Sequence, residues 1–143
     1  MSFPVRQYMS REVPTVEEQA SVVEAAKTLI KFNIGLLIVL KDGQPVGVVT
    51  ERDFVERVVA READPKKLTA SEIMSSPLIT IDPDEDIIRA SELMQKNHIR
   101  RLPVVKDGII CGVITARDIA QHCGDYIDKA TREVMRWAWG AIP

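Results

Sequence analysis

Two short sequences combine a hydroxyl, a guanidinium and a carboxylate at the same spacing: Thr50-Glu51-Arg52-Asp53 and Thr115-Ala116-Arg117-Asp118. Each follows an apolar run and precedes a helical pattern, so we expect both at strand-to-helix junctions. A threonine with an acid three residues later is typical of a capping box, whose cap stabilises a helix by about 0.5–2 kcal/mol. The same groups suit a sugar-phosphate, because helix N–H groups and arginine attract phosphate and aspartate accepts from ribose hydroxyls. These residues alone leave both interpretations open.

The two motifs belong to an internal repeat in which the second copy follows the first at an offset of 65 residues. The register holds without a gap, pairing Met9 with Met74, Lys41-Asp42-Gly43 with Lys106-Asp107-Gly108, and Gly47-Val48 with Gly112-Val113. We predict two domains, residues 5–62 and 70–123, followed by a C-terminal helical extension over residues 124–143. Because units of this size lie near the lower limit for independent folding, the two copies should share a core.

The apolar period changes in the same order within each copy, which predicts two β-α-β-β-α units and an α+β fold. In the first copy we expect a helical turn at Val5–Met9, a strand at Val13–Val16, a helix with Val22, Ala25 and Leu29 on one face, and strands at Leu36–Leu40 and Val46–Val49. In the second copy we expect a helical turn at Ala70–Met74, a strand at Leu78–Ile81, a helix over Pro83–Asn97, and strands at Leu102–Val105 and Ile110–Ile114. A further helix is expected from each Thr-x-Arg-Asp. An Asp-Gly pair in each copy is typical of the tight turn in a hairpin.

Two of the expected helices, one in the second copy and one near the C-terminus, have specific sequence signals. Asp82-Pro83-Asp84-Glu85 offers an aspartate N-cap and a proline at the first helical position, so the helix of the second copy is expected to start there. Between Asp125 and Trp139, apolar residues recur at helical spacing, namely Tyr126, Ala130, Val134 and Trp137. This pattern predicts a helix that covers the core or a subunit interface.

Composition excludes several classes of protein. The chain has 143 residues, 45% hydrophobic and 28% charged, as in ordinary globular proteins. Nineteen basic residues against 21 acidic ones leave a net charge of −2, which disfavours a general electrostatic binder of nucleic acid. The longest apolar run, Ile34–Leu40, is too short to span a membrane, and no secretory signal is present. We therefore expect a cytoplasmic protein with no membrane association.

The repeat from Val5 to Cys123 resembles a pair of CBS domains, the family named after cystathionine beta-synthase. Three segments carry the resemblance by their order: Gly47–Asp53, Gly112–Asp118 and His98–Val105. It implies two domains that associate through their sheets about a pseudo-two-fold axis, leaving two related clefts. Members of the family commonly bind AMP, ADP or ATP there, and some bind S-adenosylmethionine. The implied function is a non-catalytic regulatory or energy-sensing module with an adenine nucleotide as ligand and no required cofactor.

The resemblance also implies a ligand set, carried over position by position. Asp53 and Asp118 would contact ribose hydroxyls, and the residues near phosphate or ribose would be Thr50, Arg52, Thr115 and Arg117. The adenine would lie among the early strands, and the residues implicated there are Val13, Thr15, Ile79 and Thr80, with Ile34 and Ile99 as apolar walls.

Basic residues distinguish the two copies. Arg100 and Arg101 match positions that point at phosphates in the similar regulatory gamma subunit of AMP-activated protein kinase, and Pro103 belongs to the same segment. The first copy has Gly35 and Leu36 at the arginine positions and Ile38 at the proline position. We therefore expect unequal occupancy of the two clefts, although the sequence does not decide which one fills.

Other chemistry has weaker signals. The soft metal ligands are His98, Cys111, His122 and Cys123, whose spacing does not match a usual zinc site, so we expect no metal. Neither a P-loop nor a nucleophile elbow occurs, and the acidic pairs lie at expected helix starts, so we expect no enzyme.

Three interpretations of function stay open. The first is a ligand sensor that acts on an unidentified regulated protein. The second is a structural dimerisation scaffold with vestigial clefts. The third is nucleic-acid binding through a local basic patch, which the near-neutral charge disfavours; its candidate residues are Arg100, Arg101, Arg117, Arg132 and Arg136. We also expect a homodimer, for which Val55, Val58, Val59 and Trp137 could supply the surface.

Overall fold

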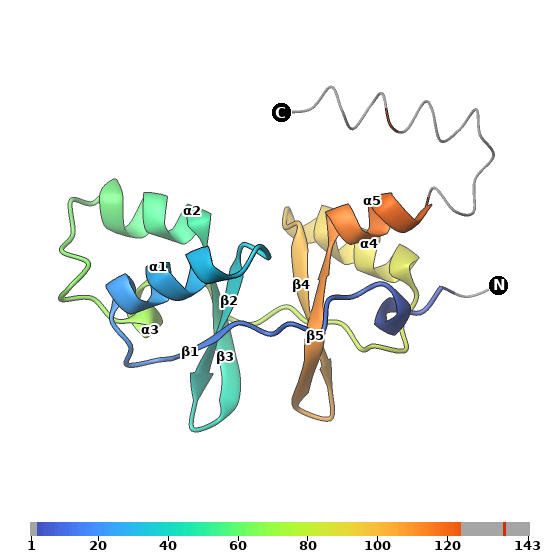
Figure 1. Ribbon diagram of the computed structural model, residues 1–143, viewed down its shortest axis with the longest axis horizontal. Helices are drawn as coiled ribbons and strands as arrows, with labels where there is room; N and C mark the ends of the chain where they lie inside the picture. The colour runs from blue at the N-terminus through green and yellow to red at the C-terminus, as the bar shows by residue number, and fades with distance from the viewer. Residues whose placement is uncertain (1–2, 124–135, 137–143) are drawn as a thin grey trace.

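The computed structural model describes residues 3–123 and residue 136, and Figure 1 shows two similar halves side by side, with strands toward the middle and helices toward the outside. The first half contains β1 (Thr15–Glu17), α1 (Val22–Lys31), β2 (Leu36–Lys41), β3 (Gln44–Thr50), α2 (Glu51–Phe54) and the π-helix η2 (Val55–Val59). The second repeat contains α3 (Ala70–Ile73), α4 (Ile87–Asn97), β4 (Arg101–Lys106), β5 (Ile109–Thr115) and α5 (Ala116–Cys123). The short 3-10 turn η1 (Val5–Gln7) opens the chain ahead of β1.

The sheets confirm the predicted hairpins and the α+β fold. β1, β2 and β3 form one sheet in that order, with β1 parallel to β2 and β3 antiparallel to β2, and β4 pairs antiparallel with β5 in the other. Asp42 and Asp107 have φ angles of 50° and 51°, and the glycine after each has a φ of 78°. Two successive positive φ angles are the requirement of a type I′ hairpin turn.

The two faces of strand β2 contribute to two different cores. Leu37 and Val39 are fully buried in the core formed with α1. Leu36 and Ile38 point to the opposite face, where they pack with Val113 of β5 between the two halves. Because successive side chains of a strand alternate in direction, one continuous apolar run can bury both faces. The cluster between the halves confirms that the two repeats share a core.

The opening turn of each repeat packs in the half built mainly by the other. Val5 and Tyr8 lie in the core of α4, β4 and β5, and both are nearly or fully buried. Ala70 and Ile73 of α3 lie in the core of α1, β2 and β3, with exposed fractions of 0% and 1%. Sequence periodicity predicted these turns but not this exchange. Neither half has a complete core without a segment from the other repeat.

After each opening turn, the chain runs along the last strand of the half in which that turn packs. Ser10 pairs with β5 and Ser75 pairs with β3 through isolated bridges. Glycine makes the close approach possible, since a Cβ on Gly47 would lie 2.8 Å from the carbonyl oxygen of Ser75. A Cβ on Gly112 would overlap the carbonyl oxygen of Ser10.

The predicted strand Leu78–Ile81 is wrong in extent, because only Ile81 pairs with β4. In the first repeat, the Ile38 N–H donates to the Pro14 carbonyl at 2.9 Å and extends the pairing of β1. The equivalent residue of β4 is Pro103, which has no N–H to donate to Ile79. The ladder of the second repeat is therefore limited to a single bridge.

The predicted start of the helix at Pro83 is also wrong, since α4 begins at Ile87 with Asp86 as its N-cap. Residues 82–85 form a turn whose carbonyls accept from the main chain of η1. Asp86 holds this junction together, because one carboxylate oxygen accepts from the Phe3 N–H at 2.8 Å and the other from the Ile88 N–H at 2.9 Å. These bonds, the Phe3 bond first, hold the pKa of Asp86 below its ordinary value.

The helices after the Thr-x-Arg-Asp motifs begin where predicted. In the first repeat, however, four residues of α2 are followed by the π-helix η2 instead of a continuous α-helix. The predicted C-terminal helix falls outside the described residues except for Arg136, which is helical. None of the helices in the described ranges is long and apolar enough to cross a membrane.

The exchanged turns predict that a truncation in α3 destabilises the fold as a whole. We expect Ile73→Ala to lower the free energy of unfolding by about 2–5 kcal/mol, because it leaves a cavity in a core where Ile73 is 1% exposed. The matched control is Ile88→Ala, at a position that is 63% exposed on α4, which should change stability by less than about 0.5 kcal/mol. Urea unfolding followed by far-ultraviolet circular dichroism measures both. Equal losses in the two variants would show that the opening turn does not support the core.

Candidate functional site

Both Thr-x-Arg-Asp motifs form capping boxes at the ends of β3 and β5. The Thr50 N–H donates to Asp53 Oδ2 at 2.8 Å, and the Thr115 N–H donates to Asp118 Oδ2 at 2.9 Å. In return, the Asp118 N–H donates to Thr115 Oγ1 at 3.0 Å, and the Thr50 hydroxyl has the same reciprocal role. The capping interpretation is therefore confirmed for both motifs. It uses one oxygen of each carboxylate, so the surroundings of the other oxygen decide what else the aspartate can bind.

The second oxygen of Asp53 is already bound to the crossing segment of the other repeat. Ser75 donates its hydroxyl to Asp53 Oδ1 at 3.0 Å, and the Arg57 Nε lies 3.8 Å from the same oxygen. The Arg57 guanidinium also donates to the carbonyls of Ile73 and Met74 at the end of α3. Asp53 is 5% exposed. We call the contacts of Asp53 with Ser75 and Arg57 the Asp53 clasp.

Asp118 has no such clasp, although its position is equivalent. Ser10, the counterpart of Ser75, accepts from the Glu12 N–H instead. His122, the counterpart of Arg57, packs edge to face on Tyr8 with the ring centroids 5.1 Å apart. Asp118 is half-buried, and within residues 3–123 and 136 its Oδ1 has no hydrogen-bond partner. This carboxylate can accept a further hydrogen bond without losing one.

The arginines of the motifs lie on exposed surface. Arg52 donates through Nε to Glu56 at 2.6 Å, one helical turn away, and this hydrogen bond, with the charge of Glu56, raises the pKa of Arg52. A phosphate would have to compete with Glu56 for this side chain. Arg117 and Arg100 are exposed, and neither forms an ion pair with any residue that the structure describes. The Ala116 N–H donates to the Arg100 carbonyl at 2.8 Å, which places Arg100 beside the start of α5.

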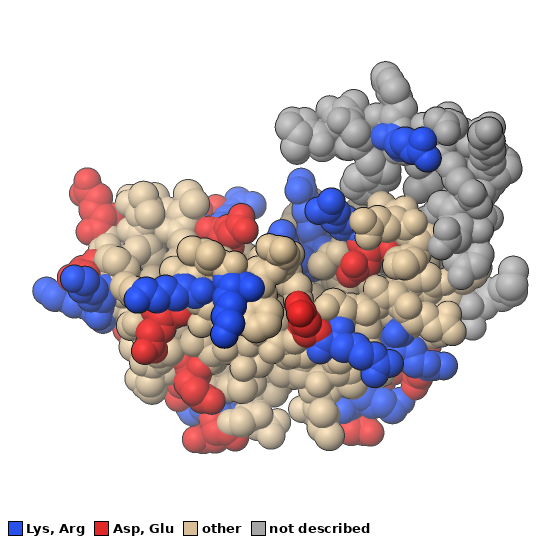
Figure 2. All heavy atoms as spheres, viewed as in Figure 1, with Lys and Arg blue, Asp and Glu red and all other residues tan. Residues whose placement is uncertain are grey.

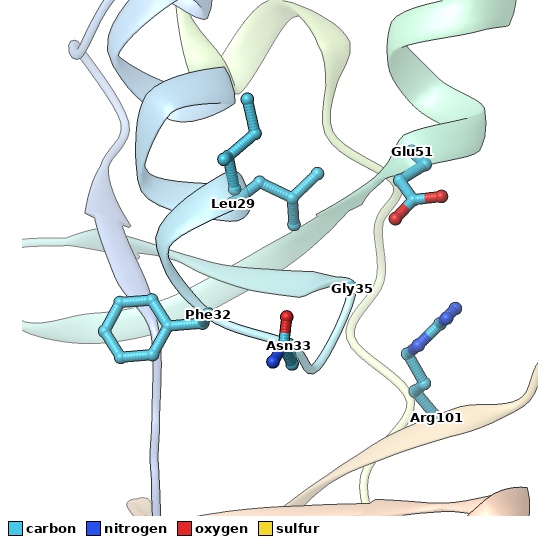
Figure 3. Close-up of a pocket in the computed structure, with 7 residues that line it drawn as sticks. Leu29, Phe32, Asn33, Gly35, Glu51 and Arg101 are labelled. Carbon is cyan, nitrogen blue, oxygen red and sulfur yellow. The ribbon is translucent and has the colours of Figure 1, made fainter.

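A cleft of about 380 Å³ opens between the repeats where α1 and α2 meet β4. Figure 3 shows Glu51 at the start of α2 and Arg101 at the start of β4 reaching into it from opposite repeats. Gly35 forms its floor with a φ of +73°, and a Cβ there would lie 2.8 Å from Arg101 Nη2. The glycine thus lets the Arg101 side chain lie against the backbone of the other repeat. The remaining lining residues are Leu29, Ile30, Phe32 and Asn33.

The residues expected around an adenine are spread over two clusters. Val13 and Ile34 pack in the cluster between the sheets, whereas Ile79 and Ile99 pack against the core of the second half. Thr15 and Thr80 are exposed, and Pro103 is buried on β4. Arg101 lies in a cleft with Gly35, and the apolar residues expected around an adenine divide between the two clusters.

Sequence reasoning missed three residues of this region: Glu51, Arg57 and Ser75. Glu51 had a detectable signal, because its counterpart in the other repeat is Ala116. A charge that is present in just one of the two copies indicates a difference between the clefts. Arg57 and Ser75 gave no signal, since their contacts depend on the crossing of the second repeat over the first. Across residues 3–123 and 136, no group of three or more His, Cys, Asp or Glu side chains has a metal-binding arrangement.

A family model decides what this architecture is. The model of the CBS domain matches the chain twice, over residues 5–60 and 70–125. The chain belongs to the CBS-domain family. It is a tandem CBS-domain pair, and the observed fold agrees with the resemblance seen in the sequence.

Relatives of this CBS-domain pair support the assignment. Protein MK0525 of Methanopyrus kandleri is 36% identical over 122 residues, covering 84% of this chain and 62% of its own length. The CBS domain-containing protein YhcV of Bacillus subtilis is 33% identical over 116 residues, covering 81% of this chain and 82% of its own. Two further curated relatives are much longer, and the match spans 34% and 52% of their lengths.

Among solved structures, the CBS-domain pair of protein MJ0100 is similar throughout. It is 32% identical with a TM-score of 0.79, and the match covers 89% of this chain and all of that chain. That structure is a complex with 5′-methylthioadenosine and S-adenosyl-L-methionine.

The clasp predicts that the two equivalent aspartates differ in their effect on stability. Asp53→Ala removes the acceptor of the Ser75 hydroxyl and the ion pair with Arg57, and should cost about 1–3 kcal/mol of unfolding free energy beyond the loss of the cap. Asp118→Ala removes only the cap and should cost about 1 kcal/mol. Urea unfolding of the two variants beside the unsubstituted chain measures the difference. Losses of the same size would mean that the clasp contributes nothing to stability.

Proposed function

We propose that this CBS-domain pair is a non-catalytic regulatory module that binds an adenine nucleotide, AMP, ADP or ATP, between its repeats. The observation that carries the proposal is the Thr-Asp pair present at both strand-to-helix junctions, beside arginines contributed by the second repeat. Aspartate suits ribose hydroxyls and arginine suits phosphate. The ligands of the MJ0100 pair are both adenosine derivatives, which favours the nucleoside part of the proposal. S-adenosylmethionine is the second candidate on the same ground.

Regulation would follow from the position of the clefts between the repeats. A ligand shifts a conformational equilibrium only by the difference between its affinities for the two states. A nucleotide that contacts both repeats can have such a difference, because any change in their relative position alters its contacts. The regulated protein and a cytoplasmic location stay predictions from the sequence.

The alternative interpretations predict different surfaces. Nucleic-acid binding without sequence preference depends on a continuous basic face. Figure 2 shows acidic and basic side chains interspersed over much of the face drawn, with a group of basic side chains above β4. A scaffold with vestigial clefts would need Asp118 only as the cap of α5, and would have no use for its Oδ1, which has no hydrogen-bond partner among the described residues. Both alternatives are outcomes of the test below.

Thermal unfolding with candidate ligands tests the proposed function. A nucleotide at 100 times its dissociation constant should add about 2.7 kcal/mol to the free energy of unfolding and raise the melting temperature measurably. We expect this with at least one of AMP, ADP, ATP and S-adenosylmethionine, and no shift with a short RNA. Guanosine monophosphate at the same concentration is the control for base recognition. Absence of a shift with every adenosine compound would favour the scaffold, and a shift with RNA alone would favour nucleic-acid binding.

The proposed module also includes a homodimer formed through the surface of η2. Val55 and Val59 lie one helical turn apart and are 60% and 72% exposed. Val58, which the sequence also suggested for this surface, is 5% exposed and belongs to the core of the first half. Trp137 lies outside the described residues. The side chains of Val55 and Val59 give η2 an exposed apolar face, and the proposed dimer would remove this face from water.

Replacing one of these valines by an acid should disrupt the dimer. We expect size-exclusion chromatography with light scattering to give a dimer for the unsubstituted chain and a monomer for Val59→Asp, because an unpaired carboxylate is costly to bury at an interface. Ile109→Asp is the matched control, since Ile109 is 69% exposed on the β5 hairpin and should leave the dimer intact. A dimer with Val59→Asp would place the interface elsewhere.

A further inference from the structure

We propose that the two nucleotide sites implied by the repeat have separated in role. The Asp118 site, defined by Thr115, Asp118, Arg100 and Ala116, binds the nucleotide. The Asp53 carboxylate is a structural group that fastens the second repeat to the first. This inference rests on the proposed function, and it adds which of the two sites fills and how many ligands each chain takes.

The first argument is access to the carboxylates. A ribose hydroxyl that donates to Asp53 would have to reach a side chain that is 5% exposed and displace Ser75 or Arg57 from Oδ1. Displacing Ser75 costs the hydrogen bond of its half-buried hydroxyl, and displacing Arg57 costs an ion pair with a buried carboxylate, so either loss offsets the gain from the new bond. Asp118 is half-buried, and Oδ1 is its unused acceptor among the described residues. A ribose hydroxyl can donate to this oxygen without displacing a donor from the described part of the chain.

The second argument is the charge around each site. In the first cleft, the Arg101 guanidinium faces the Glu51 carboxylate, so a phosphate attracted by one is repelled by the other. At the Asp118 site, Ala116 occupies the position equivalent to Glu51, and Arg100 occupies that of Gly35. Arg100 and Arg117 enter no ion pair within the part of the chain that is described. A phosphate at this site meets these arginines, and Ala116 stands where α2 has Glu51.

The third argument is what the clasp does when no ligand is involved. Through Arg57, the clasp joins Asp53 to the carbonyls of Ile73 and Met74, and α3 completes the core of the first half. In the second half, the equivalent contact is the packing of His122 on Tyr8, which does not involve Asp118. The first half therefore uses its aspartate for folding, whereas the second half holds its opening turn by other means.

Calorimetric titration of the full chain with AMP tests this assignment. We expect one equivalent of AMP per chain. Asp118→Asn should weaken binding at least about tenfold, because the amide NH₂ cannot accept from a ribose hydroxyl while the amide oxygen can still accept from the Thr115 N–H and keep the cap. Ser75→Ala, beside Asp53, should retain the affinity of this equivalent within about twofold. Circular dichroism melting curves ensure that each variant is folded at the titration temperature.

The outcomes separate this inference from the proposed function. Two equivalents of equal affinity would overturn the inference alone, as would an unchanged affinity in Asp118→Asn. A gain of more than about twofold in the affinity of Ser75→Ala would also overturn it, because the removal of a donor that competes for Asp53 would then have improved binding. Absence of binding by AMP, ADP, ATP and S-adenosylmethionine to the unsubstituted chain would overturn the proposed function, and this assignment with it.

Discussion

The exchange of opening turns between the repeats is the constraint on which the rest of the structure depends. Val5 and Tyr8 are buried in the half formed by α4, β4 and β5, and Ala70 and Ile73 in the half formed by α1, β2 and β3. A unit of about 55 residues buries too little surface to be comfortably stable alone. Borrowing a turn from the other repeat enlarges each core, and it makes the stability of the two halves interdependent. The cluster between the sheets then seals the remaining apolar faces.

The same exchange brings folding contacts next to the candidate sites. Each crossing segment runs along the last strand of a hairpin, directly beside the Thr-x-Arg-Asp motif that follows this strand. A side chain on that segment can therefore either bond to the motif's aspartate or leave it available for a ligand. The Ser75 hydroxyl donates to Asp53, whereas the Ser10 hydroxyl accepts from the nearby Glu12 N–H. Two serines at equivalent positions thus give two sites of different availability.

Sequence periodicity predicted the elements well and their partners less well. The alternation in β2 and the stripe of α1 follow from burial, so the pattern identifies them directly. Periodicity shows that Ile73 is buried but not against which half, because an apolar residue satisfies either core equally. The absent strand before α4 had a local cause that the sequence contains, namely the missing N–H of Pro103. The N–H that the strand requires is known from the register of the first repeat, where Ile38, the counterpart of Pro103, donates to Pro14.

The motif itself shows why the site could be predicted only in part. A capping box and a ribose site use the same threonine and aspartate, and the sequence alone cannot separate them. The structure shows that they are not alternatives, because the cap occupies one carboxylate oxygen and leaves the other to the surroundings. For Asp53 those surroundings are Ser75 and Arg57, which lie 22 and four positions away in sequence. The motif is therefore the same in both repeats, and the two aspartates differ because Ser75 donates to Asp53 while Ser10 does not donate to Asp118, and because the counterpart of Arg57 is His122.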